Sequence, residues 1–340
     1  MSECFGGSGM VQATSDVIRQ VAVIVVNYGT AELSIAAIQS VLNAPESDLM
    51  ITIHVVDNDS PGDDVAILNA AFRNRNWGAQ VSIYAETDNH GFGRGNNVVL
   101  DRLADAPPDA VFLLNPDAEV EPDTIPKLVA VMNTRAAVGA VGAGISQPGT
   151  GPVVAAFRFP SLTNAFVGPL AFGPISRLFA NHLQPLDPMT PEGPVDWVAG
   201  AAVMFRWDAL VEVGFFDPDF FLYQEEVELM WRLNKAGWLC WYAPDARVSH
   251  LEGAATQVGS GARIAAAKPR YWYDSERLFL QKTASRPKAL AMSMARLTGA
   301  AMNKALCAVR RKPASAPSGF LRDHARFVLW PLLTGRGTGT

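Results

Sequence analysis

The chain has 340 residues, of which 49% are hydrophobic and 18% are charged, and its formal net charge is −5. This length allows one large α/β domain with an appendage, or two modest domains, and burying a core is no difficulty. The three cysteines are far apart and form neither a metal-binding spacing nor a disulfide framework, which fits a reducing cytosol. No apolar run has the length of a membrane span, and the N-terminus lacks a signal-peptide pattern, so we expect a cytoplasmic location.

The charge is distributed unevenly along the chain. Residues 261–340 contain fifteen Lys and Arg against three Asp and Glu, a local charge of +12 that leaves −17 for the first 260 residues. This split suggests that the acidic body does the chemistry while the basic tail meets an anionic membrane surface or nucleic acid. Aromatic residues are not interleaved with the basic ones in a recognisable nucleic-acid module, so we favour the membrane surface. A solvated helical face is the simpler alternative.

Short apolar runs rich in β-branched residues alternate with helical segments in the first third of the chain. Strand, helix and strand in succession imply right-handed parallel crossovers, which predicts a doubly wound α/β layer. In such a sheet, ligands bind at the carboxyl ends of the strands. Strands are expected at 21–26, 51–56, 81–84 and 110–114, and helices near 35–42, at 65–72 and after the Gly91–Asn97 loop.

From about residue 145 the alternation gives way to Pro- and Gly-rich stretches, and we expect an antiparallel portion of the same domain. Beyond Tyr271 the chain is expected to be helical and basic. The expected elements are strands at 153–159, 201–205 and 246–250, and a helix at 224–236 that ends at the C-cap Gly237. The expected division is a flexible arm at 1–19, an α/β domain at 20–260 and a basic helical extension at 261–340.

Two acidic motifs follow buried strands. Asp117 of Asn115-Pro-Asp117 ends a very apolar strand, where a carboxylate is costly unless a charge compensates it. Hydrated Mg²⁺ or Mn²⁺ that bridges to substrate phosphates would do so, although a turn or helix cap explains the same residues. Asp57, followed by Asn58, can accept a hydrogen bond from a pyrimidine N3–H or a ribose hydroxyl, with an Asx-turn as the alternative.

The segment Gly91-Phe-Gly-Arg-Gly95 lacks the spacing of a dinucleotide fingerprint. Its glycines and a following helix N-terminus can bring backbone N–H groups and Arg94 near a diphosphate, and a plain helix-entry loop is the alternative. The acidic cluster that contains Glu225 and Glu226 begins a predicted helix, where negative charge is favourable in itself. Nearby aromatic residues would partly desolvate a carboxylate and raise its pKa toward that of a general base. A lone His250 is more often structural than catalytic.

In their order, these motifs resemble those of family 2 inverting glycosyltransferases of the GT-A fold, with the greatest likeness to bacterial rhamnosyltransferase-like members. The resemblance runs from about residue 21 to residue 253 and rests on the ordered set. Its members are Asn27-Tyr28, Val55–Ser60, Asn89–Asn97, Leu113–Asp117, Gly214–Pro218, Tyr223–Glu228 and Ser249-His250. It implies an α/β fold with a Rossmann-like, mostly parallel central sheet, an antiparallel acceptor-side portion and a helical C-terminal extension.

The resemblance also implies roles for single residues. Asp57 would contact the nucleobase, and Asn115-Pro-Asp117 would stand where the family has its Asp-X-Asp metal motif, with Asn in place of the first Asp. His250 would be a further metal or diphosphate contact. Glu226, with Glu225 beside it, would be the catalytic base, although the family has Asp at positions 226 and 228. The full expected set is Asn27, Tyr28, Asp57, Asn58, Gly91, Arg94, Asn97 and Asn115 for the donor; Asp117 and His250 for the metal; and Asp196, Trp197 and Gly200 for the acceptor.

The function implied is a single displacement with inversion, dependent on Mg²⁺ or Mn²⁺, from a dTDP- or UDP-sugar such as L-rhamnose. The acceptor would be a glycan or a polyprenyl-diphosphate-linked glycan in cell-surface polysaccharide synthesis. The expected location is cytoplasmic, peripheral at the inner face of the plasma membrane. A non-catalytic nucleotide-sugar-binding protein on the same fold is the alternative, and the oligomeric state is left open.

Overall fold

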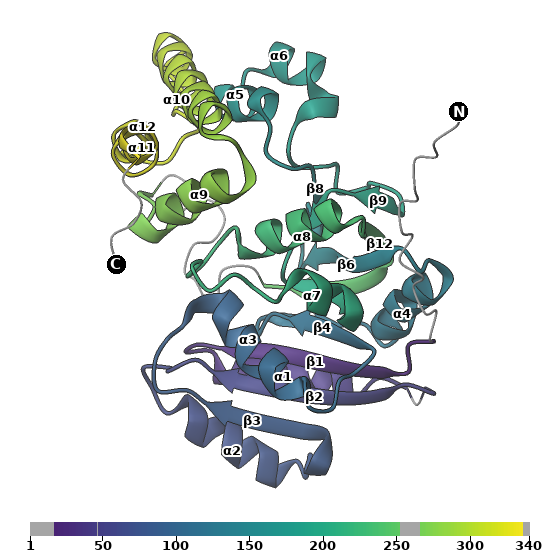
Figure 1. Cartoon of the computed structure of the whole chain (residues 1–340). Helices are drawn as coiled ribbons and strands as arrows, with labels where there is room; N and C mark the ends of the chain where they lie inside the picture. Colours follow the sequence, from purple (N-terminus) through teal and green to yellow (C-terminus); the bar gives the residue numbers. More distant parts are fainter. Residues whose placement is uncertain (1–16, 46, 252–265, 336–340) are drawn as a thin grey trace, which may run out of the picture.

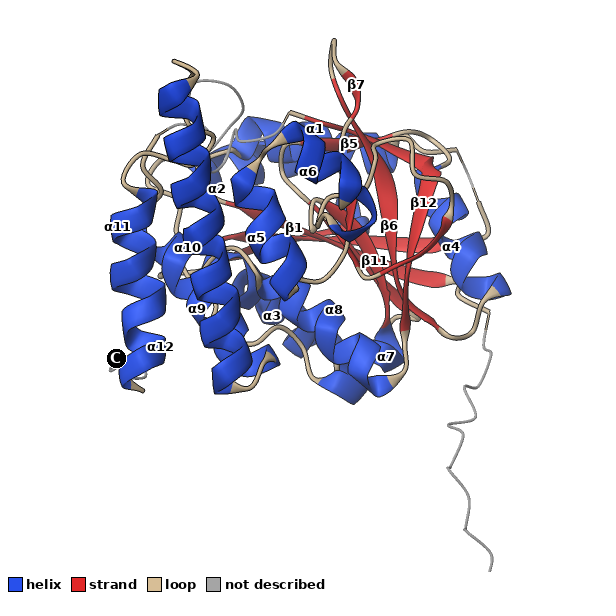
Figure 2. Ribbon diagram, turned by 90° about the horizontal axis from the view of Figure 1, so that it is seen from above, coloured by secondary structure: helices blue, strands red, loops and turns tan. Residues whose placement is uncertain are grey.

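The structure is a computed structural model that describes residues 17–45, 47–251 and 266–335, so most of the expected N-terminal arm lies outside the described residues. A curled β-sheet carries helices on both faces, and a helical part stands to one side of it (Figures 1 and 2). Helices α1 (Ala31–Leu42), α2 (Asp64–Asn74) and α4 (Thr124–Thr134) bury their apolar sides on one face. Helices α3 (Gly91–Leu103), α7 (Trp207–Val213) and α8 (Glu225–Ala236) do so on the other.

The first half of the sheet is parallel, as the sequence predicts. Residues 21–27 of its central strand are all buried, because the strand is covered on both faces. The strand order here is β3-β2-β1-β4, so the carboxyl ends meet at one edge. The strands are β1 (Gln20–Asn27), β2 (Met50–Asp57), β3 (Val81–Ala85) and β4 (Ala110–Leu114), with the short 3₁₀ helix η1 (Gly78–Gln80) before β3.

Beyond β4 the sheet is mixed. Strand β11 (Ala202–Arg206) is antiparallel to both of its neighbours, β4 and β6 (Val138–Gln147). Strand β12 (Leu239–His250) runs parallel to β6, and β5 (Ala118–Val120) is antiparallel to β12. Thus β12 brings His250 back beside β5 and the loop that follows β4. The predicted antiparallel strand at 201–205 is confirmed.

Two sequence predictions are wrong in detail. The strand expected at 153–159 shrinks to β8 (Ala156–Phe157), which pairs with β10 (Trp197–Val198) in a separate two-stranded sheet. Prolines at 152 and 160 flank this segment and supply no N–H for a longer ladder. The expected loop Gly91–Asn97 is instead the beginning of α3. Short strands β7 (Gly151–Pro152) and β9 (Gly193–Val195) pair with β6 and β12.

The basic C-terminal region is helical, as expected. In Figures 1 and 2, α10 runs beside α5, and α9, α11 and α12 lie next to them. Among the described residues, no helix is both long and apolar enough to cross a membrane. The elements are α5 (Leu162–Leu170), α6 (Gly173–Leu178), η2 (Ala180–His182), α9 (Arg270–Thr283), α10 (Arg286–Val309), α11 (Phe320–His324), the π-helix η4 (Ala325–Leu329) and α12 (Trp330–Thr334).

Candidate functional site

Asn27 organises the carboxyl ends of β1 and β2. Its buried amide nitrogen donates to Asp57 Oδ1 (2.7 Å) and Asp64 Oδ1 (3.0 Å). Its amide oxygen accepts from the hydroxyls of Thr30 and Ser34. Because both the nitrogen and the oxygen of the amide are bonded inside the protein, Asn27 holds the loops that follow β1 and β2 in place.

Asp57 is 1% exposed, and its carboxylate is held by more than Asn27. Ser60 donates to Asp57 Oδ1 from its hydroxyl (2.6 Å) and to Oδ2 from its backbone N–H (3.2 Å). Asp59, between them, has a left-handed φ of 60°. This is the Asx-turn that the sequence suggests as an alternative. It fixes the Asp57 carboxylate, a hydrogen-bond acceptor, at the carboxyl end of β2.

Asn58 connects the end of β2 to the start of α3. Its amide donates to Asn89 Oδ1 and to the carbonyl of Gly91, both at 3.1 Å, and its oxygen accepts from His90 N. The backbone N–H of Phe92, which follows Gly91, donates to Phe221 O (3.1 Å). The start of α3 is therefore tied to the segment that precedes α8.

Asp117 and His250 form a close pair. Asp117 Oδ1 lies 3.0 Å from His250 Nε2, and their side chains are 3% and 12% exposed. Asn115 Nδ2 lies 3.4 Å from the same nitrogen. The pair is 133 residues apart in the sequence and is joined by the antiparallel register of β5 and β12, in which His250 faces Ala118.

Glu225 and Glu226 are the first two residues of α8. A Cβ placed on Gly200 would lie 3.6 Å from both Cβ and Cγ of Glu226, so Gly200 packs against the methylene groups of this side chain. The next residue, Ala201, accepts a hydrogen bond from Asn115 N (2.9 Å). A short chain of contacts therefore joins the Asp117–His250 pair to Glu226.

The two carboxylates are poorly solvated. Glu225 Oε2 and Glu226 Oε2 are both buried and have no hydrogen-bond partner. Burial, together with the adjacent Glu226 charge, raises the pKa of Glu225 well above its ordinary value. Burial also raises the pKa of Glu226, although backbone hydrogen bonds oppose this rise. Both shifts favour the protonated form of the pair over the doubly ionised one.

Glu228, the third acid of the cluster, has a structural partner. Both of its oxygens accept from Arg232 Nε at 2.9 Å. The rest of this guanidinium donates to the backbone carbonyls of Val213, Gly214 and Phe215. Glu228 thus orients the arginine that holds the turn before the aromatic segment.

The remaining predicted residues divide by exposure. Tyr28 and Arg94 are exposed, so a ligand can reach their side chains. Asn97 exchanges two hydrogen bonds with the backbone of Phe216.

The two residues expected on the acceptor side have partners within the protein. Asp196 accepts from Phe159 N, while Trp197 donates to Arg158 O and stacks on Phe157 with 4.0 Å between ring centroids. Both side chains therefore hold the segment around Arg158 in place.

Asp64 gave no separate signal in the sequence, and the backbone strain at Tyr223 and Gln224 could not be seen there either. Asp64 accepts from Asn27 and from Ala31 N at the start of α1. Gln224 and Tyr223 both have left-handed φ angles, of 70° and 71°, just before the paired glutamates.

In the described part of the chain, no group of three or more His, Cys, Asp and Glu side chains lies close enough together to hold a metal ion. Asp117 and His250 can bind a cation only if other ligands complete its coordination shell, as hydrated Mg²⁺ or Mn²⁺ permits.

Comparison with sequence families gives two overlapping matches. Residues 22–169 match the family described as glycosyl transferase family 2, and residues 110–274 match glycosyl transferase family group 2. A relative from Mycobacterium tuberculosis H37Rv, an N-acetylglucosaminyl-diphospho-decaprenol L-rhamnosyltransferase, is 32% identical over 191 residues. The match covers 52% of this chain and 61% of that relative. Rhamnosyltransferase WbbL from Escherichia coli K12 is 26% identical over 167 residues, which are 47% of this chain and 61% of WbbL.

Solved structures confirm the fold. The mannosyltransferase PcManGT from Pyrobaculum calidifontis, in complex with GDP-Man and Mn²⁺, superposes with a TM-score of 0.53 at 17% identity, covering 94% of this chain and 84% of that one. GalNAc-T7 with UDP, GalNAc and Mn²⁺ gives a TM-score of 0.55 at 11% identity, covering 93% of this chain and 56% of that one. Both show the GT-A arrangement expected from the motifs.

Proposed function

The chain belongs to glycosyltransferase family 2, and on that premise we propose that it is a metal-dependent inverting glycosyltransferase. It would transfer a sugar from a nucleotide-diphosphate donor to a hydroxyl of a glycan or lipid-linked glycan. The observation that carries this proposal is the chain of contacts that leads from the Asp117–His250 pair through Asn115 to the segment at Gly200, which packs against Glu226. One carboxylate oxygen each of Glu225 and Glu226 is buried there without a hydrogen-bond partner.

The donor would bind at the carboxyl ends of β1, β2 and β4. Asp57 offers a fixed acceptor for the N3–H of uracil or thymine, which makes UDP- and dTDP-sugars the proposed donors. Two curated relatives are named rhamnosyltransferases, so L-rhamnose is the sugar we propose first.

Asp117 and His250 would hold the divalent cation, with the donor phosphates and water as its other ligands. The cation, when bound, neutralises charge on the departing nucleoside diphosphate. Glu226, next to Gly200, would take the proton from the acceptor hydroxyl. A positioned base contributes roughly 10²–10⁴ in rate, so the site needs both parts.

The mycobacterial relative is named for an acceptor with a diphospho-decaprenol carrier, and this supports a lipid-linked acceptor here. The charge of the C-terminal region agrees with a membrane-bound substrate. Exposed basic residues on and after α10 would attract anionic lipids and keep the protein at the cytoplasmic face of the membrane. They are Arg286, Lys288, Lys304, Arg310, Arg311 and Lys312.

A thermal-shift screen of nucleotide sugars tests the proposed donor class. With Mg²⁺ or Mn²⁺ present, a dTDP- or UDP-sugar should raise the melting temperature, since a ligand that binds only the folded state stabilises it. The same donor should then be hydrolysed slowly to the free sugar and nucleoside diphosphate. Binding without any metal-dependent hydrolysis or transfer would favour the non-catalytic nucleotide-sugar-binding protein instead.

A further inference from the structure

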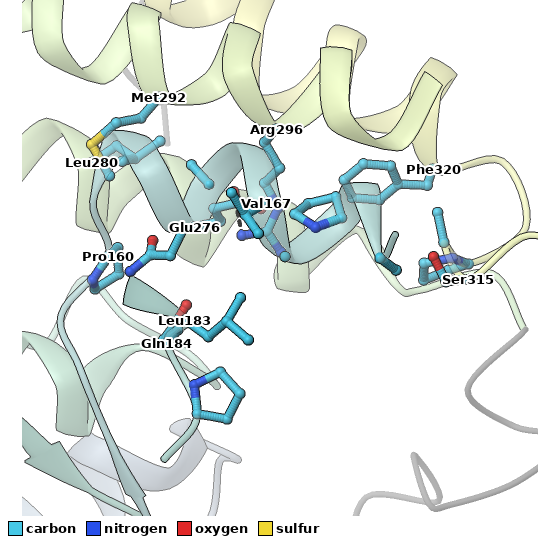
Figure 3. Close-up of a pocket in the computed structure, with 18 of the residues that line it drawn as sticks. Pro160, Val167, Leu183, Gln184, Glu276, Leu280, Met292, Arg296, Ser315 and Phe320 are labelled. Atoms are coloured by element: carbon cyan, nitrogen blue, oxygen red, sulfur yellow. Dashed lines mark ion pairs between the residues drawn. The ribbon is translucent and has the colours of Figure 1, made fainter. Parts of the chain in front are cut away.

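A cavity of about 510 Å³ lies between α5 and the C-terminal helices, apart from Asp117, His250 and Glu226 (Figure 3). Its volume is within the range of about 300–1,000 Å³ in which proteins bind small molecules. The cavity is bounded by α5, α9, α10, the segments 183–185 and 315–317, and Phe320. Gln224, the residue directly before Glu225, also lines it. The cavity therefore reaches the residue that stands two positions before Glu226 in the chain.

Most of the cavity wall is apolar, but Gln224, Glu276 and Arg296 contribute buried polar atoms to it. Glu276 Oε1 pairs with Arg296 at 3.3 Å, and Figure 3 shows this ion pair among the lining residues. Glu276 Oε2 lies 3.6 Å from His324 Nδ1, whereas the buried atoms Arg296 Nε and Gln224 Oε1 have no hydrogen-bond partner. A buried polar atom without a partner costs about 1–3 kcal/mol, so a ligand that supplies hydrogen bonds would be favoured here.

The polar atoms also limit the kind of ligand. Burial alone would raise the pKa of Glu276, but the charges of Arg296 and His324 lower it overall, so its carboxylate is ionised and only accepts hydrogen bonds. Gln224 Oε1 likewise accepts, whereas Arg296 Nε donates. Among the described lining residues, the one basic side chain, Arg296, already pairs with Glu276, so none of them is a spare cation for a diphosphate. A hydrocarbon chain would leave Gln224 Oε1 and Arg296 Nε unsatisfied.

We propose that this cavity binds a sugar unit of the acceptor, next to the sugar that receives the new residue. Hydroxyl groups both donate and accept, so one sugar can satisfy Gln224 Oε1 and Arg296 Nε together and also donate to the Glu276 carboxylate, which has lone pairs beyond its two ion pairs. The apolar walls formed by Val167, Leu183 and neighbouring residues suit its C–H faces. This inference rests on the proposed transferase function and adds that the acceptor carries at least two sugars.

Ligand-observed NMR titration of the full-length protein tests the inference. The probes are the methyl glycosides of N-acetylglucosamine and of its β-linked disaccharide, with decyl N-acetylglucosaminide as the lipid-like comparison. The disaccharide should bind about tenfold tighter than the monosaccharide, a difference of about 1.4 kcal/mol. Ala316→Trp, which fills the cavity, should abolish this preference, and Ala301→Trp on the exposed side of α10 should keep it.

Two milder variants keep the test valid if Ala316→Trp fails to fold. Glu276→Gln and Gln224→Asn should each reduce the preference for the disaccharide at least about threefold, since each weakens one hydrogen bond. Equal binding of the two methyl glycosides, or an affinity gained only through the decyl chain, would overturn the inference. Metal-dependent hydrolysis of the donor, measured on the same samples, reports on the proposed function separately.

Discussion

Glu225 and Glu226 are adjacent in the sequence but have different surroundings. Glu225 is 2% exposed, and its pKa is raised both by burial and by the charge of its neighbour. Glu226 is half-buried beside Gly200, and burial is the main cause of its raised pKa. A proton shared by the pair should therefore rest on Glu225 and leave Glu226 ionised, as a base requires.

Glu226→Gln should lower turnover by roughly 10²–10⁴ because the acceptor hydroxyl loses its base. The affinity for the donor should change little. Glu225→Gln is the matched control, since an amide resembles the protonated acid that we expect there. Steady-state transfer rates with a donor-binding titration compare the two variants. If Glu225→Gln were the inactive variant and Glu226→Gln the active one, the base would be Glu225.

The raised pKa of Glu225 also predicts how stability depends on pH. A carboxyl whose pKa is higher in the folded state favours folding while protonated, and this contribution is lost as the pH rises through the folded-state value. Glu225→Gln cannot ionise, so the variant does not lose this stability as the pH rises. Its melting temperature should therefore exceed that of the wild type by more at about pH 8 than at about pH 5. A gain that is equal at both values would show that Glu225 is not protonated in the folded protein.

The sequence indicated these residues as a candidate site because polar residues after apolar strands are conspicuous. It could not show which of them face a ligand and which face the protein. Asn27 and Asn97 look alike in the sequence, yet each gives its amide to partners that only the fold brings near. The Asp117–His250 contact, across 133 residues, depends on the pairing of β5 with β12, and β5 was not expected.

At the scale of the elements, the start of α3 shows how one glycine joins two parts of the site. Gly91 has a φ of 79°, and a Cβ there would lie 1.8 Å from the carbonyl oxygen of Phe221. This close approach lets Phe92 N donate to the same carbonyl. Gly91 therefore fixes the distance between the start of α3 and the segment that leads to Glu225.

Gly91→Ala should destabilise the protein and also lower transfer activity. Gly78→Ala is a matched control, because Gly78 also has a positive φ of 59° but open space where a Cβ would stand. The control should lose about 1 kcal/mol in the free energy of unfolding, and Gly91→Ala at least about twice that. Denaturant unfolding measures both variants. Similar losses would mean that the contact with Phe221 adjusts at little cost.

Strand β6 shows why some elements escape prediction. Its glycines weaken the apparent strand pattern, but they are required by packing. A Cβ on Gly142 would lie 2.5 Å from Val198 Cβ, and one on Gly144 would lie 2.4 Å from Pro244 O. By contrast, β1 and α8 carry strong local signals and were predicted to within a residue or two at each end.

At the scale of the whole molecule, the C-terminal helices make specific polar contacts with the α/β domain. Lys282 pairs with Asp217 (2.6 Å) and Asp219 (2.8 Å), and Ser275 donates to Leu222 O. These contacts reach the segment directly before α8. A membrane contact made by the C-terminal helices would therefore hold the proposed catalytic residues at a set height above the lipid.

Neutralising the exposed basic residues should release the protein from anionic vesicles without unfolding it. Changing Lys288, Lys304, Arg310, Arg311 and Lys312 to Gln should weaken binding at least about tenfold, since each basic residue near the surface contributes up to about 1 kcal/mol. Arg73→Gln with Arg75→Gln is the control on α2. Sedimentation with vesicles that contain phosphatidylglycerol measures the difference. If the wild type and the variant were recovered equally with the vesicles, the basic residues would be a solvated surface without a membrane-binding role.

The most direct test of the transferase proposal is release of nucleoside diphosphate from dTDP-L-rhamnose or a UDP-sugar. Wild-type protein should release it only with Mg²⁺ or Mn²⁺. Asp117→Asn should remove nearly all of this activity, whereas Asp123→Asn, which changes an exposed carboxylate paired with Lys127, should not. Release that is independent of the metal, or unchanged in Asp117→Asn, would contradict the proposed role of the Asp117–His250 pair.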